Sequence, residues 1–357
     1  MVKMYQRLFS EPPKNIVEHG KAHFGTFSPV SSRIDIKGMR APYAGVPLPA
    51  FISNFRIKSR VSFGFNLGDY IGYTEFIDFK VFGLAEVTFW NKETGKRNAY
   101  HSIMPARRRF VPIKTTQGLC ACYQRKRKIR LFWEDSHDFF KCEFRLKGDD
   151  VRPSAKGKMI SMRNDSLHTD MLFVNPAPTS SRVTACWLSS MKIRGTLHTF
   201  NKNYVQEHKV EEGIALLSMN RSYFKFHTNT IICTGLGQVR GKNILFSISV
   251  GNIDAADNNR YNSNALIIDG ISTALPPVVI THPFGVNQNW IIQDTEGMID
   301  LTFTPVSVNK RTVNIILMRS HATNIYGTFE GILLSKDGEK IVLKNFPGFI
   351  NRNRVRV

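Results

Sequence analysis

Hydrophobic and polar residues alternate along much of this chain, whereas the three-to-four-residue spacing of an amphipathic helix is rare. Alternation with a period of two places successive side chains on opposite faces of a β-strand. The runs 86–90 and 97–103 alternate in this way, and the polar, glycine-containing segment 91–96 separates them. We therefore predict a β-hairpin with its turn at 91–96.

The same pattern recurs in the C-terminal half. Strand-like runs flank 294–297 and the pair Asp337-Gly338, another run ends at Asp269-Gly270, and another follows Arg240-Gly241. Glycine tolerates the positive φ angles that a tight hairpin turn requires. Short strands separated by turn signals every ~8 to 12 residues predict an all-β sandwich or barrel rather than βαβ units.

The length of 357 residues corresponds to two domains of roughly 150 residues each. The segment 175–182, Asn-Pro-Ala-Pro-Thr-Ser-Ser-Arg, is the richest in proline and serine and is typical of a connection. We predict an N-terminal β-domain over 1–180 and a C-terminal β-domain over 181–357.

The composition, 42% apolar and 22% charged, is typical of a chain with a packed core. Apolar runs such as 47–52 and 314–318 are far shorter than the ~18 residues of a membrane-spanning helix. Glu11-Pro12-Pro13 interrupts any apolar signal segment near the start. Together with an odd number of cysteines, five, these features lead us to expect a soluble cytoplasmic protein.

Metal and cofactor sites have no clear signal. Cys120-Ala-Cys122 lacks the second pair that a zinc site needs, so we interpret it as two thiols on one face of a strand. The ten histidines are scattered. No metal and no cofactor are predicted.

Positive charge is concentrated in one segment. The chain has 49 Lys and Arg against 28 Asp and Glu, a formal net charge of +21, and nine of the positive residues lie within 101–130, which contains no acid. Clustered Lys and Arg attract polyanions through counterion release. The anion-binding candidates are Arg107, Arg108, Arg109, Arg125, Lys126, Arg127, Lys128 and Arg130.

A strand over 124–132 would divide these side chains between its two faces, with Arg125 and Arg127 on one and Lys126 on the other. No nucleic-acid-binding signature accompanies the charge. A solvated basic surface is therefore the alternative to a weak contact with an anionic membrane surface or a nucleic acid.

Sequence motifs exclude several classes of enzyme. No P-loop, H-E-x-x-H or G-x-S-x-G motif occurs, and the glycines of 235–241 precede a strand-like run rather than the helix of a dinucleotide site. Carboxylates within or beside strand-like runs are candidates for a general acid, because burial raises their pKa. They are Glu75, Asp78, Asp170, Asp254 and Asp257, and a solvent-facing position is the alternative for each.

The C-terminal third resembles a known family. In chain order the matching residues are Gly251-Asn252, the run 264–270, Trp290, the run 299–305, the run 326–331, Asp337-Gly338 and Gly348-Phe349. They resemble an uncharacterised domain-of-unknown-function family, mainly bacterial and also fungal. That family is regarded as related to the lipocalin-like hydroxyneurosporene synthase (carotenoid hydratase) and tocopherol cyclase proteins. The resemblance covers about residues 185–350, and 82–95 fits more loosely.

The resemblance implies two consecutive lipocalin-like, calycin-like antiparallel β-barrels or half-barrels. Its relatives act on long isoprenoids. The segment 218–232 departs from the family pattern, with only Arg221 and Thr228 matching, and Ser263 stands where the family has Glu. These departures imply a divergent member, and no catalytic residue is assigned.

We expect the protein to bind an apolar or amphipathic ligand, a lipid or an isoprenoid, in a β-barrel cavity. The candidate ligand-binding residues are Arg221, His227, Asp254, Asn264, Trp290 and Asp300, and each has a structural role as its alternative. An isoprenoid hydratase or cyclase-like enzyme is the second hypothesis, and it requires a carboxyl group of raised pKa in an apolar cavity. Binding of an anionic surface or nucleic acid through the basic segment and the C-terminal arginines Arg352, Arg354 and Arg356 is the third.

Overall fold

The computed structural model describes residues 5–43, 48–107, 110–137, 139–162, 165–200, 209–315 and 318–356. Two of the predicted anion-binding residues, Arg108 and Arg109, lie outside these ranges. The regular secondary structure of the described chain is all β-strand, apart from the short helix α1 (Ala50–Phe55) and a 3-10 turn at Asp135–His137. No helix within these ranges is both long and apolar enough to cross a membrane. The all-β prediction is confirmed.

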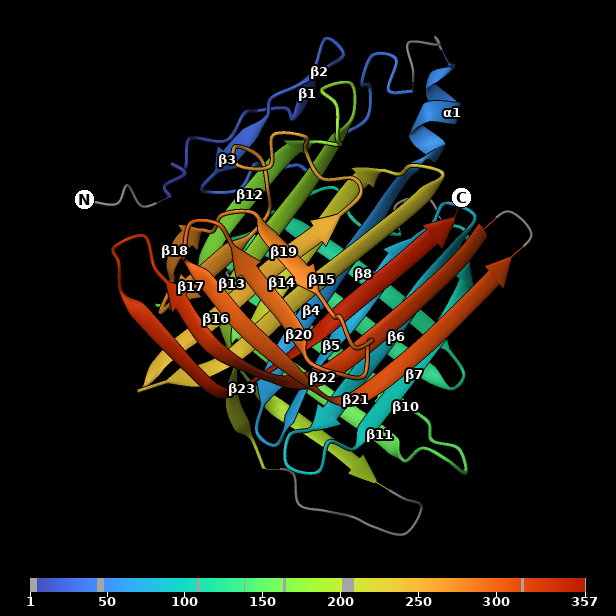
Figure 1. The fold of residues 1–357 in the computed structure, drawn as a ribbon. Helices are drawn as coiled ribbons and strands as arrows, with labels where there is room; N and C mark the ends of the chain where they lie inside the picture. Colours follow the sequence, from blue (N-terminus) through green and yellow to red (C-terminus); the bar gives the residue numbers. More distant parts are fainter. Residues whose placement is uncertain are drawn as a thin grey trace.

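The first sheet has 12 strands and curves into a nearly closed barrel (Figure 1). Its main path is β7-β6-β5-β4-β14-β13-β11-β10-β9-β8, and β12 joins β13 to β3. The bounds are β3 (Gly25–Phe27), β4 (Ile57–Leu67), β5 (Tyr70–Asp78), β6 (Phe82–Asn91), β7 (Arg97–Pro105), β8 (Gln117–Gln124), β9 (Arg127–Glu134), β10 (Phe139–Leu146), β11 (Ser154–Met162), β12 (Thr169–Pro176), β13 (Val183–Phe200) and β14 (Glu211–Tyr223). A separate pair, β1 (Val17–Glu18) and β2 (Lys21–Ala22), precedes it.

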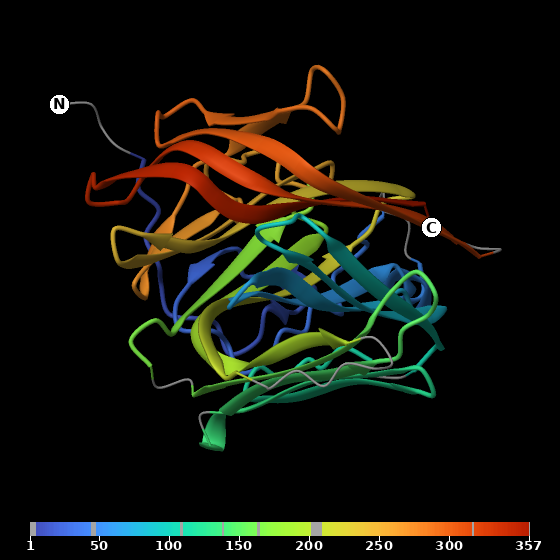
Figure 2. The ribbon, with the colours of Figure 1, turned by 90° about the horizontal axis from the view of Figure 1, so that it is seen from below.

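The second sheet has nine strands and forms a half-barrel that lies against the first (Figure 2). Its order is β18-β17-β16-β15-β23-β22-β21-β20-β19, so the last strand of the chain is central. The bounds are β15 (His227–Val239), β16 (Lys242–Gly251), β17 (Ala265–Ile268), β18 (Ile271–Ala274), β19 (Val278–Thr281), β20 (Trp290–Asp294), β21 (Ile299–Ile315), β22 (Met318–Leu334) and β23 (Lys340–Arg356).

The chain passes from the first sheet to the second between β14 and β15, at residues 224–226. The proline- and serine-rich segment 175–182 spans the turn between β12 and β13, which pair with each other inside the first sheet. A domain boundary between residues 180 and 181 stays a prediction. Because the strands before and after 224–226 pair in different sheets, we propose that the two domains divide there instead.

The predicted hairpins follow the turn residues. β6 and β7 pair across 92–96, β20 and β21 across 295–298, and β22 and β23 across a turn that contains Asp337-Gly338. Asp269 and Gly270, between β17 and β18, have φ angles of 45° and 85°, in the left-handed region that a tight turn needs. Residues 124–132 do not form a single strand, because the chain turns at 125–126 between β8 and β9.

Aromatic side chains fill the interior of the first barrel. Phe63 and Phe140 are fully buried and stack with their ring centroids 4.8 Å apart, and Trp133 stacks on Phe140 at 6.3 Å. The core of the half-barrel gathers around Phe303 and Phe329, whose rings lie 4.7 Å apart. Burial of this apolar surface is the main force that holds each barrel together.

A buried polar cluster joins the two barrels. Glu86 of β6 forms an ion pair with Arg311 of β21, with 2.8 Å between Oε2 and Nη1. Glu86 Oε1 accepts hydrogen bonds from Tyr73 (2.7 Å), Thr88 (2.9 Å) and Asn324 of β22 (3.2 Å). Burial alone would raise the pKa of Glu86, but Arg311 and the hydroxyls of Tyr73 and Thr88 bring it below its ordinary value. The cluster fixes the half-barrel on the barrel by directional contacts.

Candidate functional site

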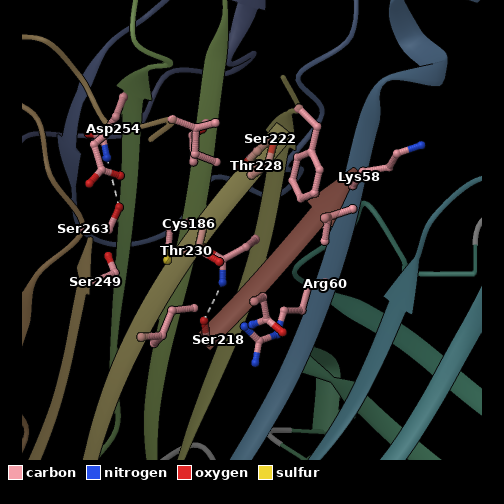
Figure 3. A pocket seen from close by; sticks show the side chains of 18 of the residues that line it. Lys58, Arg60, Cys186, Ser218, Ser222, Thr228, Thr230, Ser249, Asp254 and Ser263 are labelled. Carbon is pink, nitrogen blue, oxygen red and sulfur yellow. Dashed lines mark hydrogen bonds between the residues drawn. The ribbon is translucent and has the colours of Figure 1, made fainter. Parts of the chain in front are cut away.

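A pocket of about 130 Å³ lies between the two barrels (Figure 3). One wall comes from β4, β13 and β14 of the first barrel, and the other from β15, β16 and β23 of the half-barrel. Alternation along β14 explains its wall: Ser218, Asn220 and Ser222 line the pocket, while Leu217 and Met219, which alternate with them, are buried in the barrel core.

The lining combines small hydroxyl side chains with apolar ones. The apolar members are Ile77, Phe79, Phe224, Ile232, Val250, Ile253, Ala255 and Val355. The hydroxyl-bearing members are Ser59, Thr184, Ser218, Ser222, Thr228, Thr230, Ser247, Ser249, Tyr261, Ser263 and Ser320. Two lining amides are already engaged, because Asn220 donates to Ser218 Oγ (2.8 Å) and Asn175 donates to Ser263 Oγ (2.9 Å). Both hydroxyls can still donate.

Asp254 lies on the pocket in the connection that follows β16 (Figure 3). The backbone N–H of Gly251 donates to its Oδ2 at 2.7 Å. Asp254 is an exposed residue, yet the protein around its carboxyl group desolvates it enough to raise its pKa to about 6, against the opposing effect of the Gly251 hydrogen bond. The Asp254 carboxyl group therefore changes its charge around pH 6.

The N-terminal segment holds this connection in place. Arg7 Nη1 donates to the backbone oxygen of Asn262 at 2.9 Å, and Nη2 donates to its side-chain oxygen at 3.2 Å. Tyr5 donates to the backbone oxygen of Asn259 at 2.7 Å. Residues more than 250 positions apart thus shape the Asp254 end of the pocket together.

Two cations at the other end already have protein partners. Lys58 Nζ donates to the backbone oxygens of Phe79 (2.8 Å) and Phe55 (3.1 Å), and it lies 4.6 Å from the centroid of the Phe55 ring. Burial, with Lys80 nearby, lowers the pKa of Lys58 to about 8. Arg60 forms an ion pair with Glu75. The pocket therefore offers neutral donors and acceptors together with the titratable Asp254.

Of the residues predicted to bind ligand, Asp254 lines this pocket and the others lie elsewhere. Arg221 is buried on the inner side of β14, where its guanidinium donates to Ser59 Oγ (2.8 Å) and to the backbone oxygens of Val111 (2.9 Å) and Pro112 (2.5 Å). It joins the barrel wall to the 111–112 segment.

His227, at the start of β15, is exposed, and Asp300 is exposed and accepts a hydrogen bond from Gln293. Asn264 is buried. Its Oδ1 accepts a hydrogen bond from the Ser249 N–H and its Nδ2 donates to the Pro276 carbonyl, each at 2.8 Å. Trp290 is fully buried in the half-barrel core, and its Nε1 donates to the Val286 carbonyl at 3.2 Å.

The other candidate acids have protein partners or lie at the surface. Glu75 is buried beside Arg60, and burial raises its pKa while Arg60 opposes the rise. Asp78 forms an ion pair and Asp170 accepts a hydrogen bond from a tryptophan indole. Asp257 is exposed.

The predicted basic segment divides between two places. Arg107 is exposed just after β7, whereas Arg125, Lys126 and Lys128 are exposed at the hairpin between β8 and β9. Alternation places Arg127 inward, where it is buried and lies 5.1 Å from the Tyr100 ring centroid.

Arg130 lies 3.6 Å from Glu143 on the neighbouring strand. The predicted pair Cys120 and Cys122 is buried on one face of β8, where burial raises the pKa of both thiols. These cysteines are core residues.

The pocket residues that sequence reasoning missed are the serines and threonines of β14, β15 and β16. Their local signal is weak, because a serine at every second position of a strand is also typical of a solvent-facing surface. They lie partly within 218–232, the segment in which the chain departs from the family pattern.

Comparison with known proteins gives a family match and distant structural neighbours. Residues 50–357 match the model of a family described as a domain of unknown function, DUF2804. No curated protein matches the chain. Kievitone hydratase from Nectria haematococca is 10% identical over 84% of this chain and 88% of its own, with a TM-score of 0.43. An AttH-like protein from Nitrosomonas europaea is 10% identical over 88% and 98%, with a TM-score of 0.46.

Proposed function

Because this chain belongs to the DUF2804 family, whose function is unknown, we propose its function from the pocket between the barrels: the protein binds a small amphipathic molecule there. One observation carries the proposal, the meeting of hydroxyl and apolar side chains from both barrels around a common space. Binding sites for small molecules combine an apolar lining with a few placed polar groups. The volume of about 130 Å³ suits a small molecule or the polar end of a longer one, since sites for drug-sized ligands measure about 300–1,000 Å³.

The charged residues at the pocket indicate the class of ligand more closely. The cations Lys58 and Arg60 are occupied by carbonyl groups and by Glu75. Asp254, with its pKa near 6, donates a hydrogen bond when protonated and repels anions when ionised. We infer a neutral, oxygen-bearing ligand. A ligand that accepts a hydrogen bond from protonated Asp254 binds more weakly above pH 6, because Asp254 is then ionised.

The test is a titration with the neutral fluorophore N-phenyl-1-naphthylamine. Ser218→Phe and Ser249→Phe place a ring in the pocket from opposite walls, and Ser166→Phe adds the same ring at an exposed turn outside it. We expect one-to-one binding by the wild type and by Ser166→Phe, with about tenfold weaker binding by the two blocked variants, or about 1.4 kcal/mol. Equal binding by all four proteins would contradict the proposal.

A raised carboxyl pKa on a pocket also favours a second function, the acid-catalysed hydration of an alkene. Asp254 would donate its proton to one alkene carbon, water would add to the other, and the proton released by that water would return to the carboxylate. With the isoprenoid alcohol farnesol as probe, we expect a product heavier by one water from the wild type and from Asp257→Asn, but not from Asp254→Asn. Unchanged farnesol with the wild type rules this function out for that substrate class.

A further inference from the structure

One end of the molecule gathers strand termini of both barrels. β14 ends at Tyr223, paired with Ile57 at the start of β4, and β15 begins only four residues later. Phe82 pairs with Pro105, so the β5–β6 turn and the end of β7 lie at this end as well. The half-barrel contributes the end of β23 and the start of β22, where Val355 and Met318 pack with Phe79 and Phe82. We call this surface, together with α1, the basic end.

Large apolar side chains are exposed at the basic end. On the short helix α1, Phe51 is 75% exposed, Phe55 43% and Ile52 40%, and Phe226 in the connection from β14 to β15 is 52% exposed. The helix is joined to that connection, because the Phe224 N–H donates to the carbonyl of Arg56, the residue after the helix, at 3.0 Å, and the Arg56 side-chain Nε donates to the Phe224 carbonyl at 3.2 Å. Figures 1 and 2 both show α1 near the C-terminal end of the chain. A cluster of exposed aromatic and aliphatic side chains marks an interaction surface.

Arginines stand beside this cluster in a register set by the sheet. Arg356 pairs with His227 on one side and Arg319 on the other, and Arg354 pairs with Asn229 and His321. Directly paired residues, and residues two apart on one strand, share a face of the sheet. Val355 between them packs toward the first barrel, so the arginines point to the opposite side. In Figure 1 no other described segment passes in front of these strand ends.

Among the residues that the structure describes, these cations have no acidic partners. Within the described ranges, none of Arg319, Arg354, Arg356, Lys225 and Arg107 forms an ion pair, whereas the carboxylate of Asp78 at this end is taken by Lys80. Arg356 instead lies 5.2 Å from the centroid of the Phe226 ring. Like charges placed side by side on a sheet destabilise it, and an anionic partner would relieve that repulsion.

We propose that the basic end is a docking surface for an anionic lipid bilayer. Exposed aromatic and aliphatic side chains insert at the level of the lipid headgroups, while Lys and Arg beside them are attracted by anionic lipids. A nucleic acid would use the arginines and could stack on Phe51, but it offers no apolar medium for Ile52. Phe79 and Val355 at this end also line the pocket, but the exposed side chains of α1, Phe226 and the arginines do not, so the proposal holds whether or not the pocket binds a ligand.

The experiment is sedimentation of the full chain with vesicles of phosphatidylcholine alone and of phosphatidylcholine with 30% phosphatidylserine, without added ligand, at low and at physiological salt. We expect binding to the phosphatidylserine vesicles that weakens with salt and is at least tenfold weaker for Phe51→Ser/Phe55→Ser and for Arg354→Ala/Arg356→Ala. Matched controls are Phe284→Ser, which removes a phenylalanine 82% exposed in another loop, and Lys340→Ala/Lys344→Ala, at the opposite end of β23. Both controls should bind as the wild type does.

Three results would overturn the proposal: no binding to phosphatidylserine vesicles at low salt, binding that the basic-end variants leave unchanged, or retention on RNA that Phe51→Ser/Phe55→Ser leaves intact while the vesicles bind nothing. Circular dichroism confirms that each variant is folded. The pocket variant Ser218→Phe should bind vesicles like the wild type, so a failure here leaves the ligand-binding proposal to its own test.

Discussion

At the scale of single residues, Asp254 differs from the other predicted ligand-binding residues in its surroundings. Arg221, Asn264 and Trp290 direct their polar atoms to protein partners, whereas Asp254 accepts one backbone hydrogen bond and faces the pocket. A carboxyl group with spare hydrogen-bonding capacity in a concave place can interact with a ligand. Its position also makes the stability of the folded protein depend measurably on pH.

We predict that Asp254→Asn removes a pH-dependent part of the stability. The pKa of Asp254 rises from 3.8 to about 6 on folding, so the folded state binds the proton more tightly than the unfolded state. The wild type therefore loses stability as the pH rises from 3.8 to about 6, and the loss stays constant above that. Urea unfolding at a series of pH values should show the free energy of unfolding of the Asn variant rising relative to that of the wild type over this pH range.

Asp257→Asn makes the same substitution three residues away, at an exposed position. It should track the wild type at every pH. A difference between Asp254→Asn and the wild type that does not change with pH would show that the Asp254 carboxyl is not desolvated on folding.

At the scale of strands and turns, local chemistry predicted much of the fold. The hairpins at 92–96, 269–270 and 335–339 follow Gly-containing turns whose φ requirements are visible in the sequence. The turn at 125–126 was missed because Arg125 and Lys126 carry no such signal, and their neighbours continue the alternation. Long strands such as β13 and β23 also lack a local signature, since each pairs along part of its length with a strand that is distant in sequence.

A bulge in the half-barrel gives a prediction at this scale. The register of β22 and β23 shifts between Phe329 and Gly331, and Gly331 has a φ of 128°. A Cβ atom there would lie 2.0 Å from the Asp300 carbonyl oxygen. We expect Gly331→Ala to lower the free energy of unfolding by about 3 kcal/mol, through backbone strain and the clash.

The matched control is Gly297→Ala, also at positive φ (73°) but with open space around the added methyl. It should cost about 1 kcal/mol in the same urea unfolding experiment. Equal losses for the two variants would mean that the bulge is not closely packed against β21.

At the scale of the whole molecule, the pocket exists because two barrels built from separate parts of the chain face each other. Its walls bring together Ser222 of β14, Thr228 of β15 and Ser320 of β22. No local pattern marks these hydroxyls as one site, because they meet only once β15 and β23 lie against β4 and β14. Family resemblance indicated two barrels, but the meeting surface between them required the structure.

The contact between the barrels can be tested at Glu86 and Arg311. Both side chains are buried, at 2% and 7% exposure, and breaking one partner of such a pair leaves an uncompensated charge. We expect Arg311→Met to cost about 3 kcal/mol, and Glu86→Gln/Arg311→Met to cost at least about 1 kcal/mol less than the sum of the single variants. The exposed pair Lys242–Glu339 serves as control, and Glu339→Gln should cost less than about 1 kcal/mol. Additive losses at Glu86 and Arg311 would contradict a direct coupling between the barrels.

The most direct measurement is native mass spectrometry of the protein purified from its host, followed by extraction and identification of whatever it carries. Wild type and Ser166→Phe should carry one copy of a neutral, oxygen-bearing molecule, and Ser218→Phe and Ser249→Phe should carry little of it. The same molecule at the same occupancy in all four proteins would place its site outside the pocket. Wild-type protein that is consistently empty, and that takes up no neutral amphipathic probe, would contradict ligand binding altogether.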